Sequence, residues 1–193
     1  MSARRLTAAI MISGRGSNMM ALVNAAADPA YPVAFTHILS DKPEAPGLAW
    51  AQAQGFETEI IDPADALGIS TALDNLNVDL VCLAGYMRIL PKTVTDRWTG
   101  RMLNIHPSLL PKHRGLHAQA QALKAGDTRA GATVHLVNED VDAGEILSQE
   151  HVDVLPDDTV DTLSTRILAV EHVIYPKAVA DYAEKLRARG FGS

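Results

Sequence analysis

Short apolar runs alternate with helical patterns along the first half of the chain. Runs at residues 8–12, 33–39, 58–61, 79–84 and 101–105 predict five strands. Helical patterns at 17–28, 45–54, 64–76 and 92–98 lie between them. Strands that are apolar on both faces are typical of a parallel sheet covered by helices. The alternation therefore predicts a doubly wound, mostly parallel α/β sheet.

The pattern changes in the second half. Residues 115–125 predict a helix, and extended runs at 133–137 and 146–154 follow with no helical pattern between them. Two successive extended runs predict an antiparallel pair added to one edge of the sheet. Residues 159–189 form one long C-terminal helical pattern, in which Pro176 predicts a kink or a break.

A glycine-rich segment, Ser13 to Asn18, separates the first predicted strand from the first predicted helix. Glycines expose backbone N–H groups, and a helix N-terminus carries partial positive charge, so this loop predicts a phosphate site. No Gly-Lys-Ser/Thr follows, and Met19 stands where a dinucleotide fingerprint has its third glycine. The alternative is an ordinary tight turn capped by Ser17.

Asn104 and His106 close the fifth predicted strand. Residues two apart project from the same face of a strand, so these side chains point together and Ile105 packs the other way. Pro107 keeps His106 extended. An amide beside an imidazole suits a developing oxyanion and a proton transfer, which makes the pair candidate catalytic residues.

An acidic turn, residues 139–144, follows the run at 133–137. One of its carboxylates could orient the ring of His106 and stabilise its charged form. The residues alone do not distinguish Asp140 from Asp142, and an acidic turn without function remains the alternative.

Composition narrows the function classes. The 193 residues fit a single domain, and the net charge of −6 argues against a general nucleic-acid binder. One cysteine, Cys82, excludes an intrachain disulfide, and the histidines lack metal-site spacing, so we expect no metal. No apolar run approaches the roughly 18 residues of a membrane helix. We expect a cytoplasmic protein that does not bind membranes.

Four motifs occur together in a familiar order. They are Ser13-Gly14-Arg15-Gly16-Ser17-Asn18, Ala84-Gly85-Tyr86-Met87-Arg88-Ile89-Leu90, Asn104-Ile105-His106-Pro107-Ser108-Leu109-Leu110-Pro111 and Asp142-Ala143-Gly144. Over nearly its whole length the chain resembles the phosphoribosylglycinamide formyltransferase family, which are folate-dependent enzymes of purine biosynthesis. The resemblance implies a Rossmann-like formyltransferase fold across residues 1–193. It also implies formyl transfer from the co-substrate 10-formyltetrahydrofolate to the amine of glycinamide ribonucleotide.

The same resemblance implies roles for individual residues. Asn104 would hydrogen-bond the oxyanion, and His106 in its charged form would stabilise it and help to move protons. Asp142, rather than Asp140, would hold His106. The substrate-binding residues would be Gly16, Ser17, Asn18 and Glu171. The folate-binding residues would be Met87, Arg88, Ile89, Leu90, Asn104, Val137, Asn138, Glu139, Asp140, Val141 and Asp142.

Two segments qualify this picture. Residues 112–117 match a mobile loop that covers the site. Relatives often carry a basic residue in the segment matching 62–73 that contacts the substrate phosphate, but this chain has no Arg or Lys there. We hypothesise that Arg15 compensates.

Three rival functions are set against this one. Formyltetrahydrofolate hydrolase uses a similar catalytic set, but its N-terminal regulatory domain has no room here, since the first strand begins by Thr7. Methionyl-tRNA formyltransferase needs a C-terminal domain and a basic surface for tRNA. A non-catalytic folate or nucleotide-binding module is the third rival. The oligomeric state, monomer or homodimer, stays open.

Overall fold

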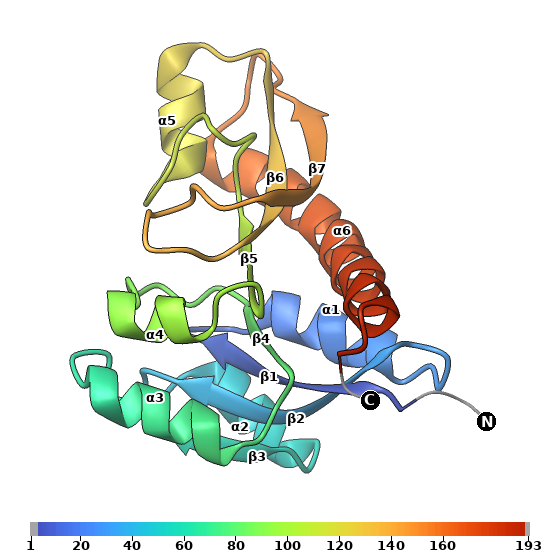
Figure 1. The fold of residues 1–193 in the computed structure, drawn as a ribbon. Coiled ribbons are helices and arrows are strands. Elements are labelled where there is room, and N and C mark those ends of the chain that lie inside the picture. Colours follow the sequence, from blue (N-terminus) through green and yellow to red (C-terminus); the bar gives the residue numbers. More distant parts are fainter. Residues whose placement is uncertain (1–3, 192–193) are drawn as a thin grey trace.

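Seven strands form one mixed sheet, and six helices pack around it (Figure 1) in residues 4–191, which the computed structural model describes. The strands are β1 (Leu6–Ile12), β2 (Val33–Ser40), β3 (Glu57–Ile60), β4 (Leu80–Leu83), β5 (Met102–His106), β6 (Arg129–Leu136) and β7 (Ile146–Asp153). The helices are α1 (Ser17–Ala26), α2 (Pro46–Ala53), α3 (Ala66–Asn75), α4 (Lys92–Arg97), α5 (Ala118–Ala125) and α6 (Val160–Ala188).

The strand order is β3-β2-β1-β4-β5-β6-β7. The first five strands of the chain are parallel, and β6 and β7 join antiparallel at the β5 side. The chain moves outward from β1 to β3 and then returns to place β4 on the other side of β1. The order of strands therefore reverses between β1 and β4, the position at which open α/β sheets bind ligands. The predicted fold class is confirmed.

Alternate residues of the central strands enter two hydrophobic cores. Ile10 and Ile12 of β1 join a cluster with residues of α1 and α6. Ala9 and Met11 of the same strand join a second cluster, which includes residues of α3 and α4. Burial on both faces explains why β1 and β4 are apolar throughout. The two cores thereby fix the C-terminal ends of β1, β4 and β5 next to one another.

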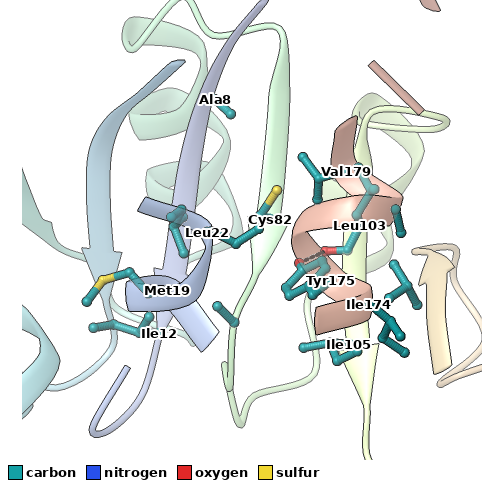
Figure 2. Packing of buried hydrophobic residues seen from close by; sticks show 14 of the residues in the cluster. Ala8, Ile12, Met19, Leu22, Cys82, Leu103, Ile105, Ile174, Tyr175 and Val179 are labelled. Atoms are coloured by element: carbon teal, nitrogen blue, oxygen red, sulfur yellow. Dashed lines mark hydrogen bonds between the residues drawn. The ribbon is translucent and has the colours of Figure 1, made fainter. Parts of the chain in front are cut away.

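Helix α6 packs across β5 through residues that Figure 2 shows close together, Leu103 and Ile105 on the strand and Ile174 and Tyr175 on the helix. The Tyr175 hydroxyl is fully buried and lies 2.9 Å from the carbonyl oxygen of Leu83 and 3.1 Å from that of Leu103. One hydroxyl proton is thus shared between the carbonyl groups of β4 and β5, which ties this helix to both strands.

Helix α6 is uninterrupted from Val160 to Ala188, so the helix does not break at Pro176, and the kink given as the other possibility stays a prediction. A proline removes one amide donor from a helix, at a cost of about 3 kcal/mol. Here Pro176 is buried, and eleven α6 residues face the protein interior. Apolar packing along the helix offsets the lost hydrogen bond.

Two predicted boundaries were also wrong. Helix α5 begins at Ala118 rather than at residue 115, because His117 before it has φ +61°, outside the helical region. Strand β6 begins at Arg129 rather than Thr133, and its first four residues pair only with β7. Three small residues, Ala130, Gly131 and Ala132, follow Arg129, and a Cβ on Gly131 would lie 2.1 Å from the Glu150 carbonyl oxygen. The start of β6 is therefore set by close backbone pairing with β7, which the alternation of side chains along the sequence does not reveal.

Candidate active site

The predicted site residues lie close together at the C-terminal ends of β1, β4 and β5. Leu83, the last residue of β4, lies opposite Asn104 of β5. The Ser13 amide, just after β1, donates a 3.1 Å hydrogen bond to the Gly85 carbonyl oxygen, just after β4. The glycine loop, the segment after β4 and the Asn104–His106 pair therefore lie side by side at the reversal of strand order.

The glycine loop forms one wall of a cleft of about 180 Å³. The cleft is lined by Ser13, Gly14, Arg15, Gly16, Ser17, Asn18, Ala84, Gly85 and Met87. Gly16 precedes α1 with φ +74°, and a Cβ there would lie 2.8 Å from Met19 Cε. No side chain caps the helix, so the cap predicted for Ser17 is wrong, while an ordinary tight turn stays the alternative to a phosphate site. An uncapped helix start beside a cleft favours binding of an anion.

Two predicted substrate-binding residues touch each other. The Asn18 amide donates a 2.6 Å hydrogen bond to the Glu171 carboxyl, which joins the start of α1 to α6. Glu171 is buried, and burial raises the pKa of its carboxyl, opposed by the hydrogen bond from Asn18. Asn18 Oδ1 is buried without a hydrogen-bond partner among residues 4–191. A pair of buried polar groups with unused hydrogen-bonding capacity is typical of a ligand-binding position.

Both ring nitrogens of His106 contact oxygen atoms. Nε2–H donates to the His113 carbonyl oxygen at 2.9 Å, since a carbonyl can only accept. Nδ1 lies 3.2 Å from Asp142 Oδ2. Burial lowers the pKa of His106 below its usual value, because the His113 carbonyl and the Asp142 charge oppose this effect only in part. The imidazolium form would donate from both nitrogens, so these two oxygens stabilise the charge that burial disfavours.

Asp142 has φ +51°, a left-handed conformation that Asp tolerates better than most residues. Its Oδ2 also accepts a 2.8 Å hydrogen bond from the Gly115 amide. Burial raises the pKa of Asp142, but hydrogen bonds from His135 and Gly115 and the charge of His106 outweigh it, so the pKa is lowered. Asp142 is thus held as a carboxylate against the ring of His106.

Asn104 completes the cluster together with a residue that the sequence analysis had passed over, His135. Asn104 Nδ2 lies 3.4 Å from Asp142 Oδ1 and 3.2 Å from His135 Nε2. His135 Nδ1–H donates to the Leu136 carbonyl oxygen, and His135 Nε2 also lies 3.4 Å from Asp142 Oδ1. His135 lies directly opposite Asn104 in the β5–β6 register, and this pairing is the signal that could have found it.

The two predicted folate-binding segments form neighbouring surfaces. Met87 and Ile89 are exposed, as is Val141 on the second segment. Lys92, two residues beyond Leu90, forms a 2.7 Å ion pair with Glu139. Both partners of this pair are largely exposed, so solvent screens the pair and it contributes little to stability. Exposed apolar side chains on facing segments fit a flat heterocyclic ring.

The segment 112–117 crosses the cluster and is anchored at its start. Asp127 accepts hydrogen bonds from Lys112 at 2.8 Å and from His113 at 2.7 Å. These contacts hold the His113 carbonyl oxygen that meets His106. The mobility predicted for this segment stays a prediction.

Two further observations concern metal binding and membrane crossing. Within residues 4–191 there is no group of three or more His, Cys, Asp or Glu side chains that could hold a metal ion. None of the helices in that range combines the length and apolarity needed to cross a membrane.

The match of this chain to known proteins agrees with the geometry. A family model described as Formyl transferase matches residues 6–179. The chain belongs to the formyl transferase family. The resemblance that the four motifs indicated is thereby confirmed.

This formyl transferase has relatives with closely similar sequences and structures. It is 37% identical over 185 residues to phosphoribosylglycinamide formyltransferase of Haemophilus influenzae, covering 91% of this chain and 86% of that protein. The crystal structure of phosphoribosylglycinamide formyltransferase from Anaplasma phagocytophilum superimposes with a TM-score of 0.90 at 46% identity. That match covers 94% of this chain and 88% of the other.

Some relatives of this formyl transferase are much longer proteins. It is 43% identical over 189 residues to the trifunctional purine biosynthetic protein adenosine-3 of Drosophila melanogaster. The match covers 93% of this chain but only 14% of that protein.

Proposed function

We propose that this chain transfers the formyl group of 10-formyltetrahydrofolate to the primary amine of glycinamide ribonucleotide, a step of purine biosynthesis. The observation that carries the proposal is the contact of Asn104, His106 and Asp142 beside the glycine loop. The relative from Haemophilus influenzae, which bears the name of this activity, supports it because the match covers most of both chains.

The reaction forms one C–N bond and breaks another. The substrate amine attacks the formyl carbon, which gives a tetrahedral intermediate with a negative oxygen and a positive nitrogen. The nitrogen loses a proton, the folate N10 gains one, and the C–N10 bond breaks to release tetrahydrofolate and the formylated product. Groups that complement both charges lower the barrier.

The catalytic cluster offers groups of both kinds. The Asn104 amide donates hydrogen bonds, and the imidazolium of His106 supplies positive charge for the developing oxyanion. The Asp142 carboxylate keeps His106 available in its charged form and accepts a proton, directly or through water. In residues 4–191 the ring nitrogens of His106 both have protein partners, so binding would exchange one of these contacts for the substrate.

The binding sites follow the remaining predicted residues. Gly16, Ser17 and Asn18 would bind the substrate phosphate at the start of α1, and Glu171 would contact the same substrate. Met87–Leu90 and Val137–Asp142 would enclose the pterin ring from two sides. Backbone amides and carbonyl groups of these segments suit the donor and acceptor pattern of a pterin.

One assay tests the proposal against its rivals. The protein is incubated with 10-formyltetrahydrofolate, with and without glycinamide ribonucleotide, and loss of the formyl group is followed. We expect turnover only when the amine is present. Turnover with water alone would indicate a hydrolase, and no turnover under either condition would indicate a non-catalytic binding module.

A further inference from the structure

Asp41 is a buried carboxylate that belongs to none of the motifs of the site. It follows β2 directly, and its side chain has no exposed surface. A charge buried in this way is costly unless it is paired and hydrogen-bonded. Its partners therefore indicate what the carboxylate is for.

The strong partner of Asp41 is Arg88, in the predicted folate-binding segment. Arg88 Nε donates a 2.7 Å hydrogen bond to Asp41 Oδ2, while half of the Arg88 side chain remains exposed. The guanidinium thus points back toward β2, and the backbone of the segment is held above it. Asp41 raises the pKa of Arg88, as expected for a close ion pair.

A second connection runs through Ser13 of the glycine loop. The Met87 amide donates a 2.9 Å hydrogen bond to Ser13 Oγ. Burial raises the pKa of Asp41, but the nearby Ser13 hydroxyl and Arg88 outweigh it and lower the pKa. Asp41 Oδ1 has no hydrogen-bond partner in residues 4–191, so the ion pair with Arg88 is the contact that holds the carboxylate.

These contacts join segments that are far apart in sequence. Ser13 follows β1, Asp41 follows β2, and Arg88 follows β4. The Met87–Ser13 and Arg88–Asp41 hydrogen bonds therefore anchor the predicted folate wall to the glycine loop and to the end of β2. An ordinary surface pair, such as Arg97 with Asp74, instead joins two helices away from the cleft.

We propose that Asp41 is a positioning residue that fixes Met87–Leu90 relative to the glycine loop and so sets folate affinity. The inference rests on the proposed function, since it takes Met87–Leu90 as the folate wall. Asp41 acts through Arg88 and does not itself touch a ligand.

The test compares four variants with the wild-type enzyme. Asp41→Asn removes the charge at nearly constant volume, and Arg88→Gln breaks the same pair from its exposed side, where folding is least affected. The double variant carries both changes. Asp74→Asn is the matched control, because it breaks an Arg–Asp pair of similar length outside the cleft.

We expect Asp41→Asn and Arg88→Gln each to raise the KM for 10-formyltetrahydrofolate about tenfold, because a misplaced binding segment weakens every contact it makes. The Kd for tetrahydrofolate should rise by the same factor in both variants. In Asp41→Asn, which changes no predicted binding residue, kcat at saturation should stay within about threefold of wild type. The double variant should be no worse than either single variant, since both remove one interaction.

Several outcomes would overturn the inference. The first is a Kd for tetrahydrofolate within twofold of wild type in both single variants. The second is a rise in Kd in the double variant equal to the product of the two single rises. The third is a rise in Kd for Asp74→Asn equal to that for Asp41→Asn. If the wild type binds tetrahydrofolate but transfers no formyl group, the proposed function fails while the Kd comparison still decides the role of Asp41. If the wild type binds no tetrahydrofolate, both ideas fail.

Discussion

Replacing Asp142 by Asn removes a negative charge beside His106 and keeps the size of the side chain. Asp142 Oδ2 contacts His106 Nδ1 at 3.2 Å and the Gly115 amide at 2.8 Å. An asparagine oxygen can still accept from Gly115, so the main loss is the charged contact with the imidazolium. A hydrogen bond to a charged group contributes about 1.5–3 kcal/mol of stabilisation. A side chain that transfers a proton in the transition state typically accelerates a reaction by a factor of about 10²–10⁴. We expect kcat to fall at least about 100-fold.

The same substitution should change the titration of His106 in a defined direction. The Asp142 charge raises the pKa of His106 against the lowering effect of burial, so its removal should lower the pKa further. The ring resonances of His106, followed by NMR as a function of pH in wild type and variant, measure this shift. The formyl-transfer assay at saturating substrates measures kcat.

Asp140→Asn is the control for this experiment. Asp140 lies two residues earlier in the same turn and is exposed, so the change alters the local charge equally without touching His106. Asp140 is also a predicted folate-binding residue, so the control is read at saturating folate, where its kcat should stay within about twofold of wild type. A kcat for Asp142→Asn within tenfold of wild type, or a raised pKa of His106, would refute the role assigned to Asp142.

Three further substitutions test other parts of the site. Glu171→Gln should raise the KM for glycinamide ribonucleotide. The pKa of Glu171 is raised in the folded state, so ionisation of its carboxyl destabilises the fold as pH rises from about 4.5 through that pKa. The Tm of wild type relative to that of Glu171→Gln should therefore fall over this pH range. A Tm difference that does not change with pH would contradict this. Arg15→Ala should raise the KM for glycinamide ribonucleotide about tenfold by loss of a phosphate contact, whereas Arg97→Ala should leave this KM unchanged. An unchanged KM in Arg15→Ala would reject the hypothesis that Arg15 replaces the basic residue missing from residues 62–73. His135→Phe should lower kcat about tenfold, measured against His151→Phe on the exposed strand β7, and equal rates in the two would contradict a role for His135.

Local rules predicted much of the site within single segments. Asn104 and His106 share one face because side chains alternate along a strand, and Ile105 packs against α6 on the other face. The strand–glycine–helix unit at Ser13–Asn18 was likewise readable from residues a few positions apart. In both cases the determining interactions are local in sequence.

Contacts between distant segments were not readable in this way. The choice of Asp142 over Asp140 came from the family resemblance, because the path of a turn after β6 depends on its pairing with β5 and β7. His135 was passed over for the same reason, since a run of alternating residues does not reveal its register on a partner strand. Continuity of α6 through Pro176 depends on tertiary burial, which helix propensity does not include.

Helix α6 carries Glu171 and Tyr175 one turn apart on the same face. Tyr175 is fixed by the carbonyl groups of β4 and β5, and Glu171 is fixed by Asn18 at the start of α1. The carboxylate is therefore preorganised by the core, and a ligand that uses it does not have to immobilise a free side chain. A packing change deep in the core, such as Tyr175→Phe, would consequently lower the affinity for the ligand that binds Glu171.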